Sequence, residues 1–173
     1  MPRAARLPSL ALALAVAFVL AVPVAACNAT PLPGTQLGTF KVTGQSTTNS
    51  CGIGAPNPWT FDVQLSQSGS TVYWSWMDGS APLSGPVNAA SHASIEDSLA
   101  GNVDGTEASL GPCTLDRSDD LELDLASGSF TGTISYSYTA ASGANCTDQL
   151  TGSGGTFDTL PCTVTYSVTA AKQ

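Results

Sequence analysis

Short runs of alternating apolar and polar residues recur along the chain after residue 35. Alternation with a period of two places successive side chains on opposite faces of a β-strand, whereas an amphipathic helix needs a period near 3.6. Ser, Thr and Gly are frequent between the runs, and the sequence has no long segment with the helical period. The pattern therefore predicts an all-β domain with many turns.

Two neighbouring runs, 59–65 and 71–78, predict a first β-hairpin. A two-residue turn at Ser68-Gly69 suits a hairpin because Gly adopts positive φ at little cost. The resulting register gathers the large apolar side chains on one face and the polar ones on the other. Opposed pairs on the apolar face are Leu65 with Val72, Val63 with Trp74, and Phe61 with Trp76.

A second hairpin is predicted around Ser127-Gly128 by the same pattern. Tyr136 and Tyr138 extend the inner face of its second strand. The acidic side chains of Glu122 and Asp124 point outward. Opposed pairs on the inner face are Leu125 with Phe130 and Leu121 with Ile134.

The remaining strands are expected near Gln36–Thr48, Leu83–Asn88, Ser91–Asp97, Glu107–Leu115 and Pro161–Thr169. The segment 89–100 fits a short helix as an alternative, because its pattern suits both periods. Eight or nine short strands in one chain predict a small antiparallel up-and-down β-barrel, or a β-sandwich. Closure into a barrel removes the exposed edges that an open sheet presents.

The N-terminus has the layout of an export signal. Arg3 and Arg6 precede an apolar run of about 13 residues, Leu10–Val22, which is shorter than the roughly 20 that a membrane-spanning helix needs. The motif that follows, Val24-Ala25-Ala26-Cys27, resembles the lipobox of bacterial lipoproteins. The resemblance implies cleavage before Cys27, a diacylglyceryl group on its sulfur and an acylated amino terminus. The alternatives are an ordinary secretory signal and a retained membrane helix.

This interpretation divides the chain into three parts. Residues 1–26 form the signal peptide, residues 27–35 form a lipidated, flexible tether rich in Pro, Gly and Thr, and residues 36–173 form a single all-β domain. Because Asn28 rather than Asp follows the lipidated Cys27, the resemblance implies the outer membrane of a bacterial cell envelope.

The cysteine count agrees with a lipid on Cys27. Five cysteines leave one over in an exported protein, and assigning Cys27 to the lipid leaves an even set for two disulfides. The second hairpin places Cys113 near Cys146, so we expect the pair Cys113–Cys146. In a closed meander the first and last strands are neighbours, which pairs Cys51 with Cys162. Val42 and Val164 then fall on opposite faces unless a bulge shifts the register.

The net charge of the chain limits the classes of binding partner that we expect. Without residues 1–26 the chain has 147 residues, with Lys41, Arg117 and Lys172 as its basic residues against all thirteen acids, a formal charge of −10. Such a surface repels phosphate, so nucleic acid is not an expected partner. The expected partners are the membrane, through Cys27, and a small apolar or sugar ligand or a protein.

Residue types with catalytic or metal-binding chemistry are sparse. His92 is the single histidine, and no Gly-x-Ser-x-Gly motif accompanies it. Glu96-Asp97 and Asp119-Asp120 are adjacent in sequence, and neighbours on a strand point to opposite faces, so neither pair shares a site. Asp116, with Asp119 and Asp120, lacks the spacing of a calcium loop and is interpreted as a solvated acidic turn. We expect no catalytic residue, metal site or cofactor.

Aromatic residues are the remaining signal. Trp74, Trp76, Tyr136 and Tyr138 lie in the two predicted hairpins and are the candidate ligand-lining residues, although a small barrel also fills its own core with such side chains. The segment Phe61–Asp78 resembles the meander strands of calycin-type barrels, the lipocalin-like and avidin-like folds. The resemblance implies a fold and transfers no binding residue.

Together these signals predict an exported, membrane-anchored lipoprotein whose β-domain is not an enzyme and serves in binding or in envelope structure. A lipocalin-like protease inhibitor is the first alternative, and a hydrolase is the second.

The lipid anchor is testable through Cys27. The variant Cys27→Ala removes the sulfur that accepts the lipid, so we expect an unprocessed precursor or loss of the protein from the membrane fraction. Fractionation with anti-tag detection measures this, with Cys51→Ala as the control cysteine variant. Membrane association equal to that of the wild type would rule out the anchor.

Overall fold

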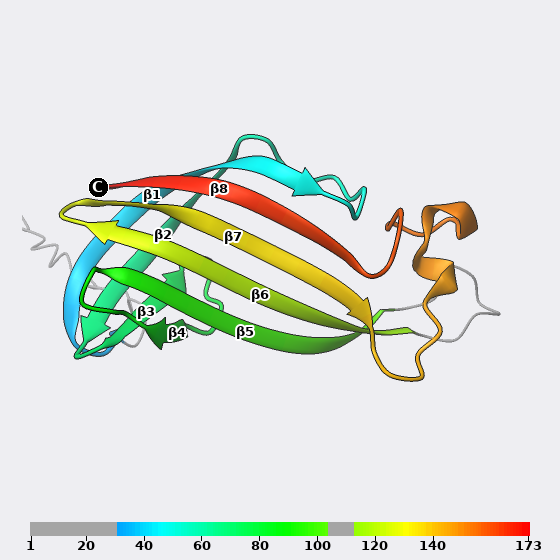
Figure 1. The fold of residues 1–173 in the computed structure, drawn as a ribbon, viewed down its shortest axis with the longest axis horizontal. Coiled ribbons are helices and arrows are strands. Elements are labelled where there is room, and N and C mark those ends of the chain that lie inside the picture. The colour runs from blue at the N-terminus through cyan, green and yellow to red at the C-terminus, as the bar shows by residue number, and fades with distance from the viewer. Residues whose placement is uncertain (1–30, 104–112) are drawn as a thin grey trace, which may run out of the picture.

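Eight antiparallel strands form a single sheet that curls into a nearly closed barrel (Figure 1). The computed structural model describes residues 31–103 and 113–173. The strands are β1 (Thr35–Asn49), β2 (Trp59–Ser68), β3 (Thr71–Trp76), β4 (Leu83–Pro86), β5 (His92–Val103), β6 (Cys113–Ala126), β7 (Ser129–Ala140) and β8 (Cys162–Lys172). Two single-turn 3₁₀ helices, η1 (Thr147–Gln149) and η2 (Thr151–Ser153), precede β8. The all-β, up-and-down barrel is confirmed.

The strand order is β4-β3-β2-β1-β8-β7-β6-β5, so every strand lies beside its neighbour in sequence and β1 also pairs with β8. The two ends of the sheet meet where β4 approaches β5. Val87 forms an isolated bridge to Ala93, and the backbone of Gly85 lies against Ser94 and Ile95. In the described parts of the chain, no helix has the length and apolar character needed to cross a membrane.

The strands on the two sides of this seam differ in length. β3 has 6 residues and β4 has 4, whereas β6 has 14 and β7 has 12. At about 3.3 Å per residue, β6 is roughly 46 Å long and β3 roughly 20 Å. One half of the molecule is therefore a closed barrel, and the other half is a curved sheet whose inner face the short strands do not cover (Figure 1).

Large apolar side chains fill the closed half. Trp74, Phe130, Leu65, Ile95 and Leu121 are fully buried or nearly so, and they come from strands on all sides of the barrel. Trp74 packs edge-on against Phe130, with 5.7 Å between ring centroids. Apart from Trp74 Nε1, which is buried without an acceptor among the described residues, this core is apolar.

The strand register of the first hairpin is shifted by two residues from the predicted one. Its turn is Gly69-Ser70 rather than Ser68-Gly69, with Gly69 at φ +59°, so Leu65 pairs with Trp74 and Val63 with Trp76. A shift of two positions keeps every side chain on its predicted face, because the period of a strand is two. Hydrophobic patterning therefore determined the buried face without determining the register. The second hairpin has the predicted turn and register.

The strand expected near Ser91–Asp97 is confirmed as part of β5, which rules out the alternative of a short helix at 89–100. One other prediction is wrong. The strand expected at Glu107–Leu115 is not separate from the one at Leu121–Leu125, since Cys113–Ala126 is a single strand. Residues 107–112 lie outside the described residues.

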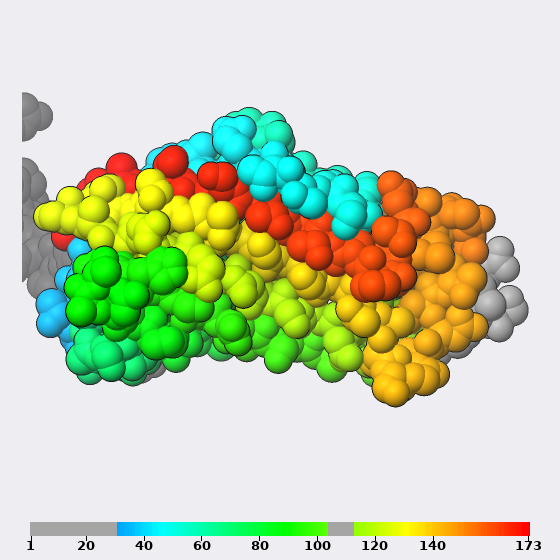
Figure 2. Space-filling model, viewed as in Figure 1, coloured from blue at the N-terminus to red at the C-terminus, as the bar shows by residue number. Residues whose placement is uncertain are grey.

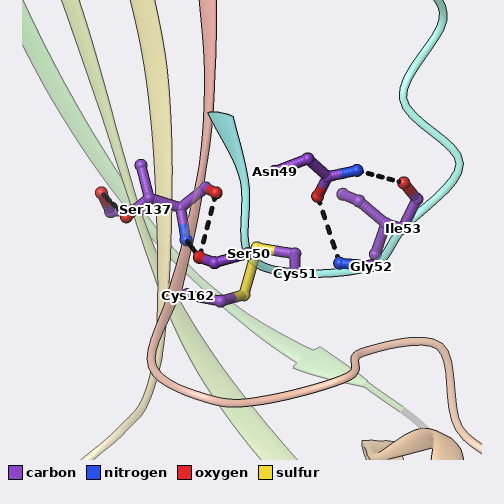
Figure 3. Close-up of a disulfide and its surroundings, with 8 residues drawn as sticks. Asn49, Ser50, Cys51, Gly52, Ile53, Ser137 and Cys162 are labelled. Atoms are coloured by element: carbon purple, nitrogen blue, oxygen red, sulfur yellow. Dashed lines mark hydrogen bonds between the residues drawn. A yellow bond between two sulfur atoms is a disulfide. The ribbon is translucent and has the colours of Figure 1, made fainter. Parts of the chain in front are cut away.

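Both disulfides join the predicted cysteines, Cys51 with Cys162 and Cys113 with Cys146. The register of β1 with β8 shifts between Ser46 and Thr48, so one extra residue bulges from β1. Because of this bulge, Val42 and Val164 lie on the same face of the sheet, and both are buried. Ser50 reinforces this end of β1 through its hydroxyl, which accepts a hydrogen bond from the Thr163 amide at 2.9 Å (Figure 3).

The chain just before β1 packs on the closed half. Leu32 is buried, and the Pro33 carbonyl accepts a hydrogen bond from the buried Ser66 hydroxyl at 2.7 Å. The carbonyl of Leu32 also accepts a bond from the Gln36 side chain. Residues 32–34, the last part of the predicted tether, thus have defined contacts with the barrel.

Closure of the seam depends on the missing side chain of Gly85. A Cβ there would overlap the carbonyl oxygen of Ser94, so Gly85→Ala forces β4 away from β5. We expect this variant to lose about 1–3 kcal/mol of unfolding free energy, as in other overpacked sites. Urea denaturation measures the loss.

Gly101→Ala in β5 is the matched control, because a Cβ there meets nothing within 4 Å. Its unfolding free energy should stay within about 1 kcal/mol of the wild type. Equal stability of the two variants would show that the β4–β5 contact contributes nothing to closure.

Candidate functional site

The uncovered inner face of the open half forms a trough. Two adjoining hollows, of about 320 Å³ and 570 Å³, make it up, and they share Ile53, Gly54, Arg117 and Tyr138. These volumes lie in the range of ligand pockets, about 300–1,000 Å³. The first hollow is lined mainly by aromatic and apolar side chains of β2, β7, β8 and the loop after β1: Ile53, Ala55, Pro56, Trp59, Tyr136, Tyr138, Val164 and Tyr166. The second continues past Leu99, Leu115 and Phe157.

The loop 50–58 forms one wall of the trough. The Cys51–Cys162 disulfide fixes its start to β8 (Figure 3). The side-chain amide of Asn49 then spans the turn: its oxygen accepts from the Gly52 amide at 3.1 Å, and its nitrogen donates to the Ile53 carbonyl at 2.9 Å. These bonds hold Ile53, which lines both hollows.

Trp59 is the centre of the aromatic lining. Its ring lies 4.9 Å from the ring of Tyr166 and 6.1 Å from that of Tyr136, measured between centroids. On its other side it contacts Phe61 at 4.3 Å and Trp76 at 5.9 Å. The aromatic residues of the trough therefore continue without a break into the packed core.

One ion pair lies among these rings. Arg117 donates from Nε and Nη2 to the two carboxylate oxygens of Asp119, at 2.6 Å and 2.5 Å. The guanidinium carbon lies 4.8 Å from the centroid of the Tyr136 ring, within cation–π range. The Asp119 side chain is 6% exposed and that of Arg117 is 38% exposed, so the arginine alone reaches the solvent of the trough.

The position of Asp119 corrects the interpretation of residues 116–120 as an acidic turn. All of them lie within β6, and Asp119 is buried on its inner face. The buried carboxylate is stable there because Arg117, two residues away on the same face, satisfies both of its oxygens. Leu121, Leu123 and Leu125 point inward, and the same alternation continues toward the N-terminus of β6, so that Asp119 and Arg117 also point inward.

The four candidate ligand-lining residues have different positions. Tyr136 and Tyr138 line the trough. Trp74 is fully buried in the closed core, and Trp76 is partly buried between Trp59, Phe61 and Trp74. The structure adds Trp59, Arg117 and Tyr166, which sequence reasoning did not select.

Paired carboxylates occur on both faces of β5 and β6. Asp97 lies opposite Asp119 on the inner face, and Glu96 lies opposite Asp120 on the outer face. A glycosidase needs one carboxylic acid and one free carboxylate flanking the substrate. Both oxygens of Asp119 are instead engaged by Arg117. Among the described residues, no group of three or more His, Cys, Asp or Glu side chains is arranged to hold a metal ion.

His92 lies far from the trough, at the start of β5. Its Nδ1 is 2.8 Å from Asp124 and its Nε2 is 2.7 Å from Glu122, whose other oxygen accepts from the Ser94 hydroxyl at 2.6 Å. Both carboxylates hydrogen-bond to the ring and raise the pKa of His92 above its ordinary value of 6.5, with Asp124 as the larger cause. This arrangement favours a doubly protonated imidazole that bridges two acids on the surface.

The His92 bridge predicts a pH-dependent stability. Because the pKa is raised on folding, the bridge contributes fully below the unfolded pKa of about 6.5 and is lost as pH rises through the folded pKa. The stability difference between the wild type and His92→Gln should therefore be largest near pH 5 and vanish well above neutrality. Urea denaturation across this range measures it.

An NMR titration of His92 gives the pKa directly, and Glu122→Gln should lower it. A folded pKa at or below 6.5 would contradict the bridge.

Comparison with known proteins supplies no family assignment. No protein-family model matches the chain, and no curated protein or solved structure matches it either. The trough and the predicted export signal are the remaining indications of function.

Proposed function

We propose that this chain is a lipid-anchored binding protein of the bacterial cell envelope, and that its ligand lies in the aromatic trough. The observation that carries the proposal is the contrast between the two halves of the barrel. The closed half is filled with its own side chains, whereas the open half leaves Trp59, Tyr136 and Tyr138 around a hollow of ligand size.

Three features support binding over the alternatives. The trough is concave and mostly apolar with a few polar groups, as ligand sites generally are. Its walls are fixed by a disulfide and by strand pairing, which reduces the entropy lost when a ligand binds. The nearly closed eight-stranded barrel also agrees with the calycin-type resemblance of residues 61–78, and many barrels of that broad group hold small ligands.

Catalysis is the less favoured function. A hydrolase needs a nucleophile or a carboxylate free to exchange a proton within the pocket. Asp119 is tied to Arg117, and His92 lies on the outer surface beside Glu122. The residues of the trough are therefore better suited to contact a ligand than to transform it.

Titration with Nile red, a neutral planar dye, tests the trough as a binding site. We expect saturable binding that Tyr138→Ser weakens about tenfold, because the variant removes a ring from the wall of the trough. Dye fluorescence measures the affinity, and circular dichroism checks the fold of each variant.

Tyr73→Ser is the matched control. Tyr73 lies on β3 between the buried Val72 and Trp74, so its side chain points to the outer face. Its loss should leave dye affinity unchanged. Absence of saturable binding, or equal loss in both variants, would refute the trough as the binding site.

A further inference from the structure

The aromatic residues of the trough carry polar atoms that bond to nothing in the described protein. The hydroxyls of Tyr136, Tyr138 and Tyr166 and the indole nitrogen of Trp59 have no hydrogen-bond partner among residues 31–103 and 113–173. None of these four atoms is fully buried, in contrast to Trp74 Nε1. The four atoms therefore keep some exposure, and the residues that carry them all line the first hollow of the trough.

These polar atoms argue against a purely hydrocarbon ligand. A lipid chain filling the trough would remove water from three hydroxyls and one indole N–H without offering a partner to any of them. Each polar group left unpaired by the ligand would weaken its binding. The ligand that suits this lining has apolar faces for the rings and hydroxyl groups for their polar atoms.

Charge argues against an acidic ligand. The one cation of the trough, Arg117, is neutralised by Asp119, and Asp97 lies opposite Asp119 in the sheet register. A carboxylate or sulfate on the ligand would meet the charges of Asp119 and Asp97 with no unpaired cation among the described lining residues.

Arg117 still has hydrogen-bonding capacity. Its Nε and Nη2 hold Asp119, but Nη1 makes no hydrogen bond within the described residues, and the side chain is 38% exposed. Nη1 is thus a fixed donor for a neutral oxygen. Burial also raises the pKa of the Tyr136 and Tyr166 hydroxyls, which keeps both protonated as donors at neutral pH.

From these contacts, and resting on the proposed binding function, we infer that the trough binds a neutral saccharide chain. Sugar rings present C–H faces that pack on Trp59 and the tyrosines, and their hydroxyls both donate to and accept from phenol groups and the guanidinium. The site is a trough open along its length rather than an enclosed cavity, so it accommodates several linked sugar units. The two adjoining hollows, with Arg117 and Tyr138 between them, form one continuous path.

Isothermal titration with maltohexaose, cellohexaose and chitohexaose tests the inference, with tetragalacturonate as the anionic counterpart. We expect at least one neutral oligosaccharide to bind and to displace Nile red, and tetragalacturonate not to bind. Binding of tetragalacturonate alone would overturn the neutral class. Binding of Nile red but of no oligosaccharide would overturn the saccharide inference and leave the binding function standing. Binding of neither would overturn both.

Tyr136→Phe and Tyr166→Phe separate hydroxyl recognition from shape. Each variant keeps the ring and removes one hydroxyl, so saccharide affinity should fall about three- to tenfold while Nile red affinity changes less than twofold. Tyr73→Phe on the outer face of β3 is the control and should change neither. Unchanged saccharide affinity in both trough variants would show that the hydroxyls do not recognise the ligand.

Discussion

A curled sheet buries its inner face only where strands stand opposite one another, and in this protein the opposing strands are of unequal length. β3 and β4 end early, so they cover the parts of β5, β6 and β7 nearest the turn 127–128 and leave the other ends of these strands uncovered. Where strands oppose, Trp74, Phe130 and their neighbours fill the interior. Where they do not, the inner residues remain as the lining of a trough. The site is thus a direct result of strand length.

The uncovered half needs other stabilising contacts, because no opposing strands pack against its inner face. The bulge at Thr47 places the apolar side chains of β1 and β8 on the same face of the sheet. The Cys51–Cys162 disulfide holds the loop 50–58 against the inner surface. The Arg117–Asp119 pair satisfies a carboxylate that is buried beside Tyr136. A buried ion pair contributes little net stability, but removing one partner is costly. These contacts fix the trough walls in the absence of opposing strands.

The alternation of apolar residues was enough to predict the fold class and the second hairpin. Both disulfides followed once the cysteine count and the closure of the barrel were added. It did not determine the turn of the first hairpin, because Ser68-Gly69 and Gly69-Ser70 place Leu65 and Trp74 on the same face. It also failed at Arg117 and Asp119, where charged residues were interpreted as a turn although they continue the inward positions of β6. Opposite charges two residues apart on a strand lie on one face, and that spacing was the available signal. The depth of the trough depends on where β3 ends, which local patterning does not encode.

The packing of Leu32 also fixes the end of the barrel at which the chain N-terminal to β1 leaves it. Leu32 and Pro33 lie against the closed half, at the end where the turns 69–70 and 127–128 and the C-terminus are found (Figure 1). If Cys27 carries the proposed lipid, five residues of about 3.5 Å each allow the closed end to rise at most roughly 17 Å from the bilayer. The segment 141–161, drawn in orange, lies at the opposite end of the molecule in the space-filling view (Figure 2). An anchor at Cys27 would therefore keep the filled end of the barrel near the lipid and place the aromatic trough toward the opposite end of the molecule.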